Sequence, residues 1–181
     1  MSKRFVSWAL LPFALVVVAG CRIHVDLKSD GSGALTAKYR AFKDQTLEQQ
    51  KKYFSSTNTT ITKLEMDADK YVTAEMTFKD VKLLSSSHLF RTMAITQSVD
   101  ASAGTTTLVG RNTNQKPGRL PDPLVEYLGK ELIISLTVPG EIVKTNATKH
   151  EGDTATWELD QQNFLDTKES VFEVTYKTPK S

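Results

Sequence analysis

Few side chains in this sequence could do chemistry, and they are widely spaced. The three histidines are His24, His88 and His150; they are widely separated, and none lies in a spacing that binds metal or forms a His-Glu-x-x-His motif. His24 and Asp26 alternate with apolar residues, so they would share one face of a strand and could form half of a metal site. Two ligands are too few to hold a metal. We therefore interpret this pair as part of an exposed strand face and expect no metal site.

Motifs for nucleophilic catalysis and phosphate binding are also missing from the sequence. No serine lies in a Gly-x-Ser-x-Gly turn, and no glycine-rich loop could cradle a phosphate. The acidic residues Glu65, Asp67 and Asp69 lie in or near an expected turn, where solvation and chain reversal explain them. We therefore expect no catalytic residue, no cofactor and no enzymatic activity.

The first twenty residues have the three-part composition of a secretory signal. Lys3 and Arg4 supply positive charge, an apolar run extends from about residue 8 to residue 18, and Ala19 and Gly20 are small. The alternative is a membrane-spanning helix, but such a helix needs about 20 apolar residues and this run is shorter. We expect residues 1–20 to be a cleaved signal peptide and residues 21–181 to form a single domain.

The end of this leader, Val18-Ala19-Gly20-Cys21, resembles a lipobox, the processing motif of bacterial lipoproteins. The resemblance implies cleavage between Gly20 and Cys21 and a diacylglyceryl group on the Cys21 thiol through a thioether. It also implies that an acyl chain such as palmitate can be added to the new amine. Arg22, in place of an aspartate, implies the outer membrane as the destination if the organism has one.

Cys21 is the only cysteine in the chain, so no internal disulfide can form. The alternatives for it are a small buried hydrophobic residue or a free thiol, and a free thiol is prone to oxidation outside the cytoplasm. Lipidation removes that liability, and two acyl chains are enough for stable anchoring. We expect the protein to lie outside the cytoplasm, in the cell envelope or periplasm. Its partner is a membrane, to which covalent lipid on Cys21 attaches it.

The charge balance argues against a nucleic-acid partner. The leader holds two of the 23 basic residues and none of the 21 acidic ones, so the remainder carries 21 of each and has no net charge. A nucleic-acid-binding domain usually shows a basic excess. The longest later apolar segment, residues 132–138, is interrupted by Ser135 and Thr137 and is too short to span a membrane.

Alternating apolar and polar residues predict about eight or nine strands. Turn residues predict four hairpins, and a last strand closes the domain. The hairpins pair residues 23–27 with 35–41, 60–66 with 71–78, 93–98 with 105–109, and 142–148 with 154–159, and the last strand is 171–176. Residues 131–138 are the most hydrophobic strand and are expected to be central.

Short helices are predicted between these strands. Residues 44–55 can form a helix capped by Asp44 or Thr46, residues 81–90 a short helix or irregular connection, and residues 121–129 a helix closed by Gly129. The expected fold class is α+β, an antiparallel β-sheet built from consecutive hairpins with two or three short helices.

Two regions of the chain resemble the LppM-like family of bacterial lipoproteins. The first comprises CRIHVDL at 21–27 and DGSG at 30–33. The second comprises VPGEIV at 138–143, Asn146, and TATWEL at 154–159. The resemblance implies an α+β fold and a non-enzymatic role at the cell envelope, with lipid or glycolipid as the suggested ligand. It carries over no catalytic residue.

Seven large apolar residues have two interpretations, as plain core or as the wall of an apolar groove, and methionines would suit varied acyl chains. They are Met66, Met76, Phe78, Met93, Leu136, Trp157 and Phe172. The leading hypothesis is a membrane-anchored lipoprotein that binds lipid or another apolar ligand at the cell envelope. The alternative is an envelope structural or protein-interaction module with a protein partner.

Overall fold

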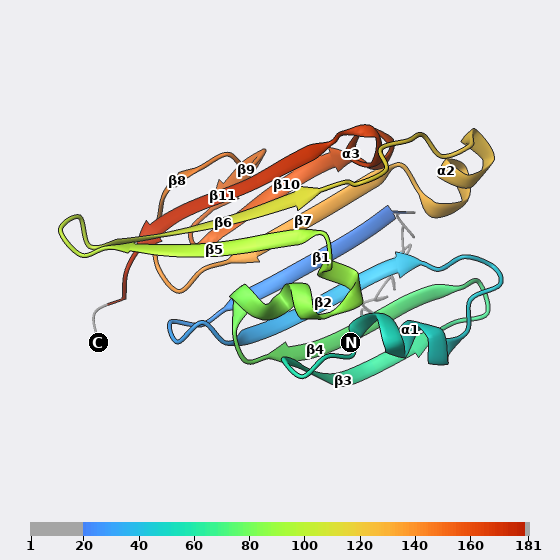
Figure 1. Cartoon of the computed structure of the whole chain (residues 1–181), viewed down its shortest axis with the longest axis horizontal. Helices are drawn as coiled ribbons and strands as arrows, with labels where there is room; N and C mark the ends of the chain where they lie inside the picture. Colours follow the sequence, from blue (N-terminus) through green and yellow to red (C-terminus); the bar gives the residue numbers. More distant parts are fainter. Residues whose placement is uncertain (1–19, 180–181) are drawn as a thin grey trace, which may run out of the picture.

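A computed structural model of the chain describes residues 20–179. Two β-sheets make up most of this part, and short helices connect their strands (Figure 1). The strands are β1 (Gly20–Leu27), β2 (Gly33–Arg40), β3 (Thr59–Met66), β4 (Tyr71–Phe78), β5 (Met93–Asp100), β6 (Thr105–Thr113), β7 (Glu131–Thr137), β8 (Ile142–Thr145), β9 (Lys149–Glu151), β10 (Thr154–Asp160) and β11 (Glu169–Lys177). The α-helices are α1 (Leu47–Phe54), α2 (Asp122–Leu128) and α3 (Gln161–Asp166), and two 3-10 helices are η1 (Val81–Ser86) and η2 (His88–Phe90).

The larger sheet has seven strands in the order β3-β4-β2-β1-β7-β10-β9. The hairpins β1–β2 and β3–β4 are antiparallel, as predicted, and β7 is central, as predicted. The expectation of an entirely antiparallel sheet of consecutive hairpins is wrong, because β1 pairs with β7 in parallel. In this ladder Cys21 lies opposite Leu132 and Val25 opposite Leu136. Alternation shows which face of a strand is buried, but it does not show which distant strand lies beside it.

The smaller sheet has four strands in the order β5-β6-β11-β8. The predicted pairing of β5 with β6 is confirmed. The predicted hairpin of residues 142–148 with 154–159 is wrong, because β8 joins this second sheet beside β11, whereas β10 pairs with the three-residue strand β9. The chain therefore crosses between the sheets after Thr145.

Capping residues account for two of the α-helices. Thr46 caps α1, where its hydroxyl accepts a hydrogen bond from the Gln49 backbone N–H while the Gln49 side chain accepts one from the Thr46 N–H. The third helix, α3, was not among the predicted elements. Asp160 caps it by accepting a hydrogen bond from the Asn163 N–H at 2.8 Å. Among residues 20–179, no helix is long and apolar enough to cross a membrane.

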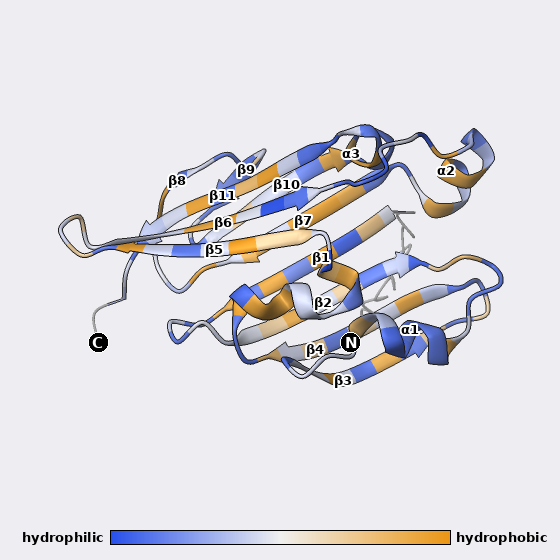
Figure 2. Cartoon of the chain, viewed as in Figure 1, coloured by the Kyte–Doolittle hydropathy of each residue, from blue (hydrophilic) through white to orange (hydrophobic). Residues whose placement is uncertain are grey.

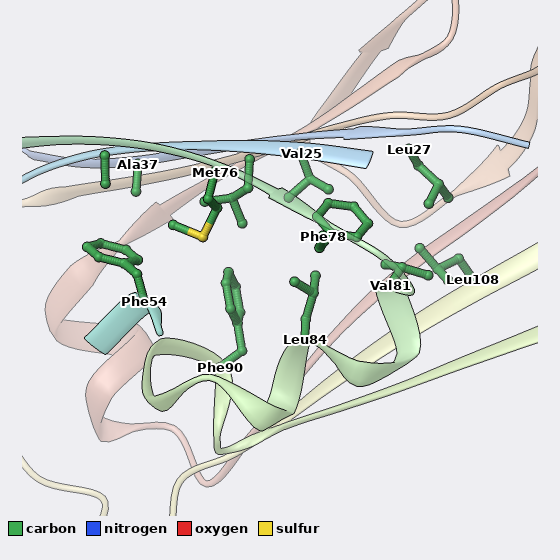
Figure 3. Close-up of a cluster of buried hydrophobic side chains, with 12 residues drawn as sticks. Val25, Leu27, Ala37, Phe54, Met76, Phe78, Val81, Leu84, Phe90 and Leu108 are labelled. Carbon is green, nitrogen blue, oxygen red and sulfur yellow. The ribbon is translucent and has the colours of Figure 1, made fainter. Parts of the chain in front are cut away.

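Apolar residues alternate with polar ones on strands such as β3, as Figure 2 shows, so each sheet has one apolar face. One half of the larger sheet, formed by β3, β4 and β2, packs against α1, η1 and η2 and is called the helix-covered half below. Phe54, Leu84 and Phe90 extend from these helices toward Met76 and Phe78 on the sheet (Figure 3).

The other half, formed by β7 and β10, packs against the smaller sheet and is called the sheet-covered half. Ala155 and Trp157 on β10 belong to a second apolar cluster together with Phe172 and Val174 on β11. The first strand, β1, runs along the seam between the two halves, since its neighbours are β2 and β7. This seam positions the candidate site.

Candidate functional site

A cavity of about 290 Å³ lies between the two sheets at the seam. Strands β1, β7 and β10 form one wall, β5, β6 and β11 form the opposite wall, and η1, η2 and α3 contribute the remaining sides. The volume is near the lower end of the range for small-molecule sites, roughly 300–1,000 Å³. A single flexible chain or a small apolar molecule suits a space of this size.

Apolar side chains dominate the cavity wall, and several are less buried than their positions in the sheets would suggest. Ile134 and Leu136 lie on the central strand β7, yet both stay partly exposed. Ile23 on β1 and Met93 and Ile95 on β5 behave in the same way. A packed interior would cover such residues. All five line the cavity, so open space there accounts for their exposure.

The opposite wall has little side-chain volume at one position, because residue 110 on β6 is a glycine. A Cβ built there would lie 3.5 Å from the Met93 sulfur and 3.9 Å from Phe172 Cβ, which are ordinary van der Waals distances. A side chain at this position would therefore enter the cavity without a backbone clash. Glycine within a strand often marks a site where another group approaches closely.

The predicted lipidation residue, Cys21, lies in the cavity wall. It is the second residue of β1, and its side chain points the same way as those of Ile23 and Val25, which also line the cavity. Burial raises the pKa of the Cys21 thiol to about 11. Gly20, on the other side of the predicted cleavage point, begins the same strand and is buried against Glu131. Val18 and Ala19, the other residues of the predicted motif, lie outside the described residues.

Only a few polar groups face the cavity, and none of the described lining residues carries a charge. Thr92, just before β5, donates a hydrogen bond of 2.7 Å from its Oγ1 to Asn112 Oδ1 on β6, so this pair is satisfied. Gln161 differs, because its Oε1 atom is buried without a hydrogen-bond partner. A buried acceptor of this kind is unfavourable unless a donor reaches it.

Trp157 holds the β10 side of the cavity in a fixed position. Its ring meets Phe172 edge to face with centroids 5.4 Å apart, and its Nε1–H donates to Asn146 Oδ1 at 2.9 Å. Asn146 Oδ1 also accepts from the Glu173 backbone N–H at 2.8 Å. Asn146 was singled out above only through a family resemblance, and its contact with Trp157 connects the two sheets beside the cavity.

The seven apolar residues with two interpretations divide between core and cavity. Met76 and Phe78 are buried in the helix-covered half, and Met66 is half-buried on β3. The remaining four, Met93, Leu136, Trp157 and Phe172, line the cavity.

The histidines are not brought together. His24 Nε2 lies 3.1 Å from Asp26 Oδ1 on the outer face of the larger sheet, whereas His88 packs against Tyr53 and His150 lies on β9. Within residues 20–179, no group of three or more His, Cys, Asp or Glu side chains could hold a metal ion.

Sequence reasoning missed Gly110 and Gln161 as parts of the site. Gln161 belongs to the unpredicted helix α3, although the capping pattern Asp160-x-x-Asn163 could have indicated a helix start there. Gly110 gave no signal, because its role depends on what lies opposite it in the folded chain.

Comparison with known proteins gave one family and one solved structure. The sequence model of the LppM domain matches residues 17–168. The folded domain of the LppM protein of Mycobacterium tuberculosis, determined by NMR, is similar in structure over 90% of this chain and 91% of that chain, with a TM-score of 0.49 and 12% sequence identity. A search of curated protein sequences found no match.

Proposed function

Since the chain belongs to the LppM-domain family, we propose that it is a lipid-anchored lipoprotein of the cell envelope that binds an apolar, acyl-chain ligand in the cavity between its sheets. One observation carries the proposal. Five large apolar side chains in the middle of the fold are left partly exposed to an open space of about 290 Å³. An unfilled apolar space is unfavourable, and an acyl chain would restore the lost contacts.

The chemistry of the wall favours binding over catalysis. General acid–base and nucleophilic reactions need titratable groups with suitable pKa values inside the site. The described lining residues include no carboxylate, histidine or lysine. The one thiol, on Cys21, has a pKa raised to about 11 and is therefore a weak nucleophile at neutral pH. A non-enzymatic binding role suits such a wall.

The lipid ligand is tested by native mass spectrometry of the leaderless Cys21→Ser protein, which has no covalent lipid, after incubation with vesicles of the producing bacterium's own lipids. We expect a bound species with the mass of a lipid. Gly110→Leu should abolish binding by filling the cavity, and Gly118→Leu should leave it unchanged, because a side chain at residue 118 would meet open space and residue 118 is not part of the cavity wall. An empty protein in all three samples would contradict the proposed ligand.

The anchor is tested separately, by mass spectrometry of the protein purified from membranes. We expect an acylated cysteine as the first residue and loss of membrane partitioning in the full-length Cys21→Ser variant. An unprocessed Met1 start, or unchanged partitioning of the variant, would contradict the proposed anchor.

A further inference from the structure

We infer that an acyl chain of the protein's own Cys21 anchor occupies the cavity between the sheets, so that the anchor and any free lipid compete for one site. This inference rests on the proposed function, because it requires Cys21 to be lipidated.

The first argument is the direction of the Cys21 side chain. Residues 21, 23 and 25 alternate onto the inner face of β1, and all three line the cavity. A lipid attached to the sulfur therefore starts its path inside the cavity wall. The raised pKa of the thiol agrees with this placement, since it reflects burial of the sulfur.

The second argument is that β1 cannot easily turn this side chain outward. The strand is paired on both sides, with Arg22 opposite Lys38 on β2 and Cys21 opposite Leu132 on β7. A one-residue slip would reverse every side chain of β1 and bring Val25 and Leu27 out of the core. The anchor is thus held by the centre of the sheet and not by a flexible linker.

The third argument is the match between the cavity and a single chain. About 290 Å³ is too little for a whole two-chain lipid, yet its wall is apolar over almost its entire extent. A diacylglyceryl group carries two chains, so one chain can enter the cavity while the other remains in the bilayer. Burial of each methylene from water is favourable both in the cavity and in the bilayer. The free energies of the two locations are therefore similar, and a chain can exchange between them.

The fourth argument is the position of Gln161, a polar residue of the cavity wall. This residue follows Asp160, which pairs with Glu131 on β7, which in turn pairs with Gly20 on β1. Gln161 therefore lies at the same end of the sheet as the anchor residue (Figure 1). A polar side chain thus lies at the end of the cavity where the polar part of the anchor would be.

The experiment is photo-crosslinking from the anchor itself. The full-length protein is produced in cells fed a fatty acid with a diazirine near the end of its chain, and the purified lipoprotein is reconstituted in vesicles of unlabelled phosphatidylglycerol and phosphatidylethanolamine. After irradiation, peptide mapping locates the attachment points. We expect intramolecular crosslinks to peptides that contain Phe90, Met93 or Leu108, which line the cavity on other elements than β1.

Two glycine variants sharpen the result. Gly110→Leu should lower the intramolecular crosslinked fraction at least fivefold, and Gly118→Leu should leave it at the wild-type value. Circular dichroism checks that each variant is folded, and Ile134→Phe is a second cavity-filling variant with the same expected effect if Gly110→Leu does not fold.

Each remaining outcome overturns the inference in a recognisable way. Crosslinks to vesicle lipid alone, with lipid still bound by the leaderless Cys21→Ser protein, would disprove the anchor as occupant and leave the proposed ligand standing. Protein whose first residue carries neither label nor acyl mass would show that Cys21 has no lipid, and both the inference and the proposed anchor would fall.

Discussion

The two halves of the larger sheet bury the same kind of apolar face, but the cavity lies against β1, β7 and β10 and not against β2, β3 or β4. In the helix-covered half, Phe54, Leu35 and Ala74 are at most 1% exposed. At the seam and in the sheet-covered half, Ile23, Ile134 and Leu136 stay partly exposed around the cavity. Short helices can direct large side chains into a sheet from several angles, whereas two sheets about 10 Å apart are filled only by residues at fixed positions. Gly110 leaves one of those positions empty.

The largest expected effect tests this contrast through stability. Phe54→Ala should lower the free energy of unfolding by about 4 kcal/mol, because it leaves a void in a fully packed region. Ile134→Ala should cost only about 2 kcal/mol, the low end for such truncations, since Ile134 already borders open space. Denaturant titration of both variants measures the difference. Equal losses would show that the two halves are packed alike.

The second effect concerns the reactivity of the unlipidated Cys21 thiol. Burial raises its pKa from 9.0 to about 11, and two units correspond to about a 100-fold lower thiolate fraction at pH 8. Alkylation of the folded leaderless protein should be slower by about this factor than alkylation in denaturant. The neutral thiol is favoured in the folded state, so this contribution to stability is complete below pH 9 and is lost as the pH rises toward 11. Equal rates in both states would place the sulfur in solvent.

The third effect concerns a substitution that should make the sheet-covered half as completely packed as the helix-covered half. Gly110→Leu should raise the free energy of unfolding of the empty, leaderless protein by about 1 kcal/mol, because it fills the cavity and removes a glycine from a strand. Gly118→Leu, at a position in open space, should change it by less than about 0.5 kcal/mol. Thermal unfolding of both variants in the same buffer distinguishes them, and a destabilised Gly110→Leu protein would mean that the cavity is smaller than described.

The smallest effect concerns two matching turns, one in each sheet. Asp30 accepts hydrogen bonds from Ser32 in the β1–β2 turn, and Asp100 accepts them from Ser102 and Ala103 in the β5–β6 turn. These bonds lower the pKa of both carboxyl groups. Their contribution to stability is therefore present above the unfolded pKa, near 4, and is lost as the pH falls below it. In the Asp30→Asn and Asp100→Asn variants, the thermal unfolding midpoint should fall slightly less between pH 5 and pH 2.5 than it does in the wild type. The two variants should differ from the wild type to a similar degree.

Local features of the fold were predictable from the sequence because short-range physics determines them. Thr46 could be identified as a helix cap, and the turn at residues 29–33 indicated a hairpin, since both depend on residues close in the chain. The inward faces of β4 and β11 followed from alternation, as with Phe78 and Val174. Three of the four predicted hairpins are present.

The candidate site could be predicted only in part. Trp157 and Phe172 were identified as apolar residues that could line a groove. The empty space beside them depends on Gly110, which lies 47 residues before Trp157 in the chain. The parallel pairing of β1 with β7 was likewise hidden, because nothing in either strand specifies the other. Cys21 was predicted as a lipidation residue, which stays a prediction, whereas its position in the cavity wall required the folded structure.

The parallel ladder between β1 and β7 also sets the order in which the chain can fold. Cys21 and Leu132 lie 111 residues apart in the sequence and side by side in the sheet. If the chain is exported from its amino terminus, β1 reaches the far side of the membrane before β7 and cannot pair with it until β7 follows. Contacts of such long range slow folding and leave strand edges exposed meanwhile. We therefore expect the last third of the chain to complete the fold, with the β1 edge of the β1–β2 hairpin unpaired until β7 arrives.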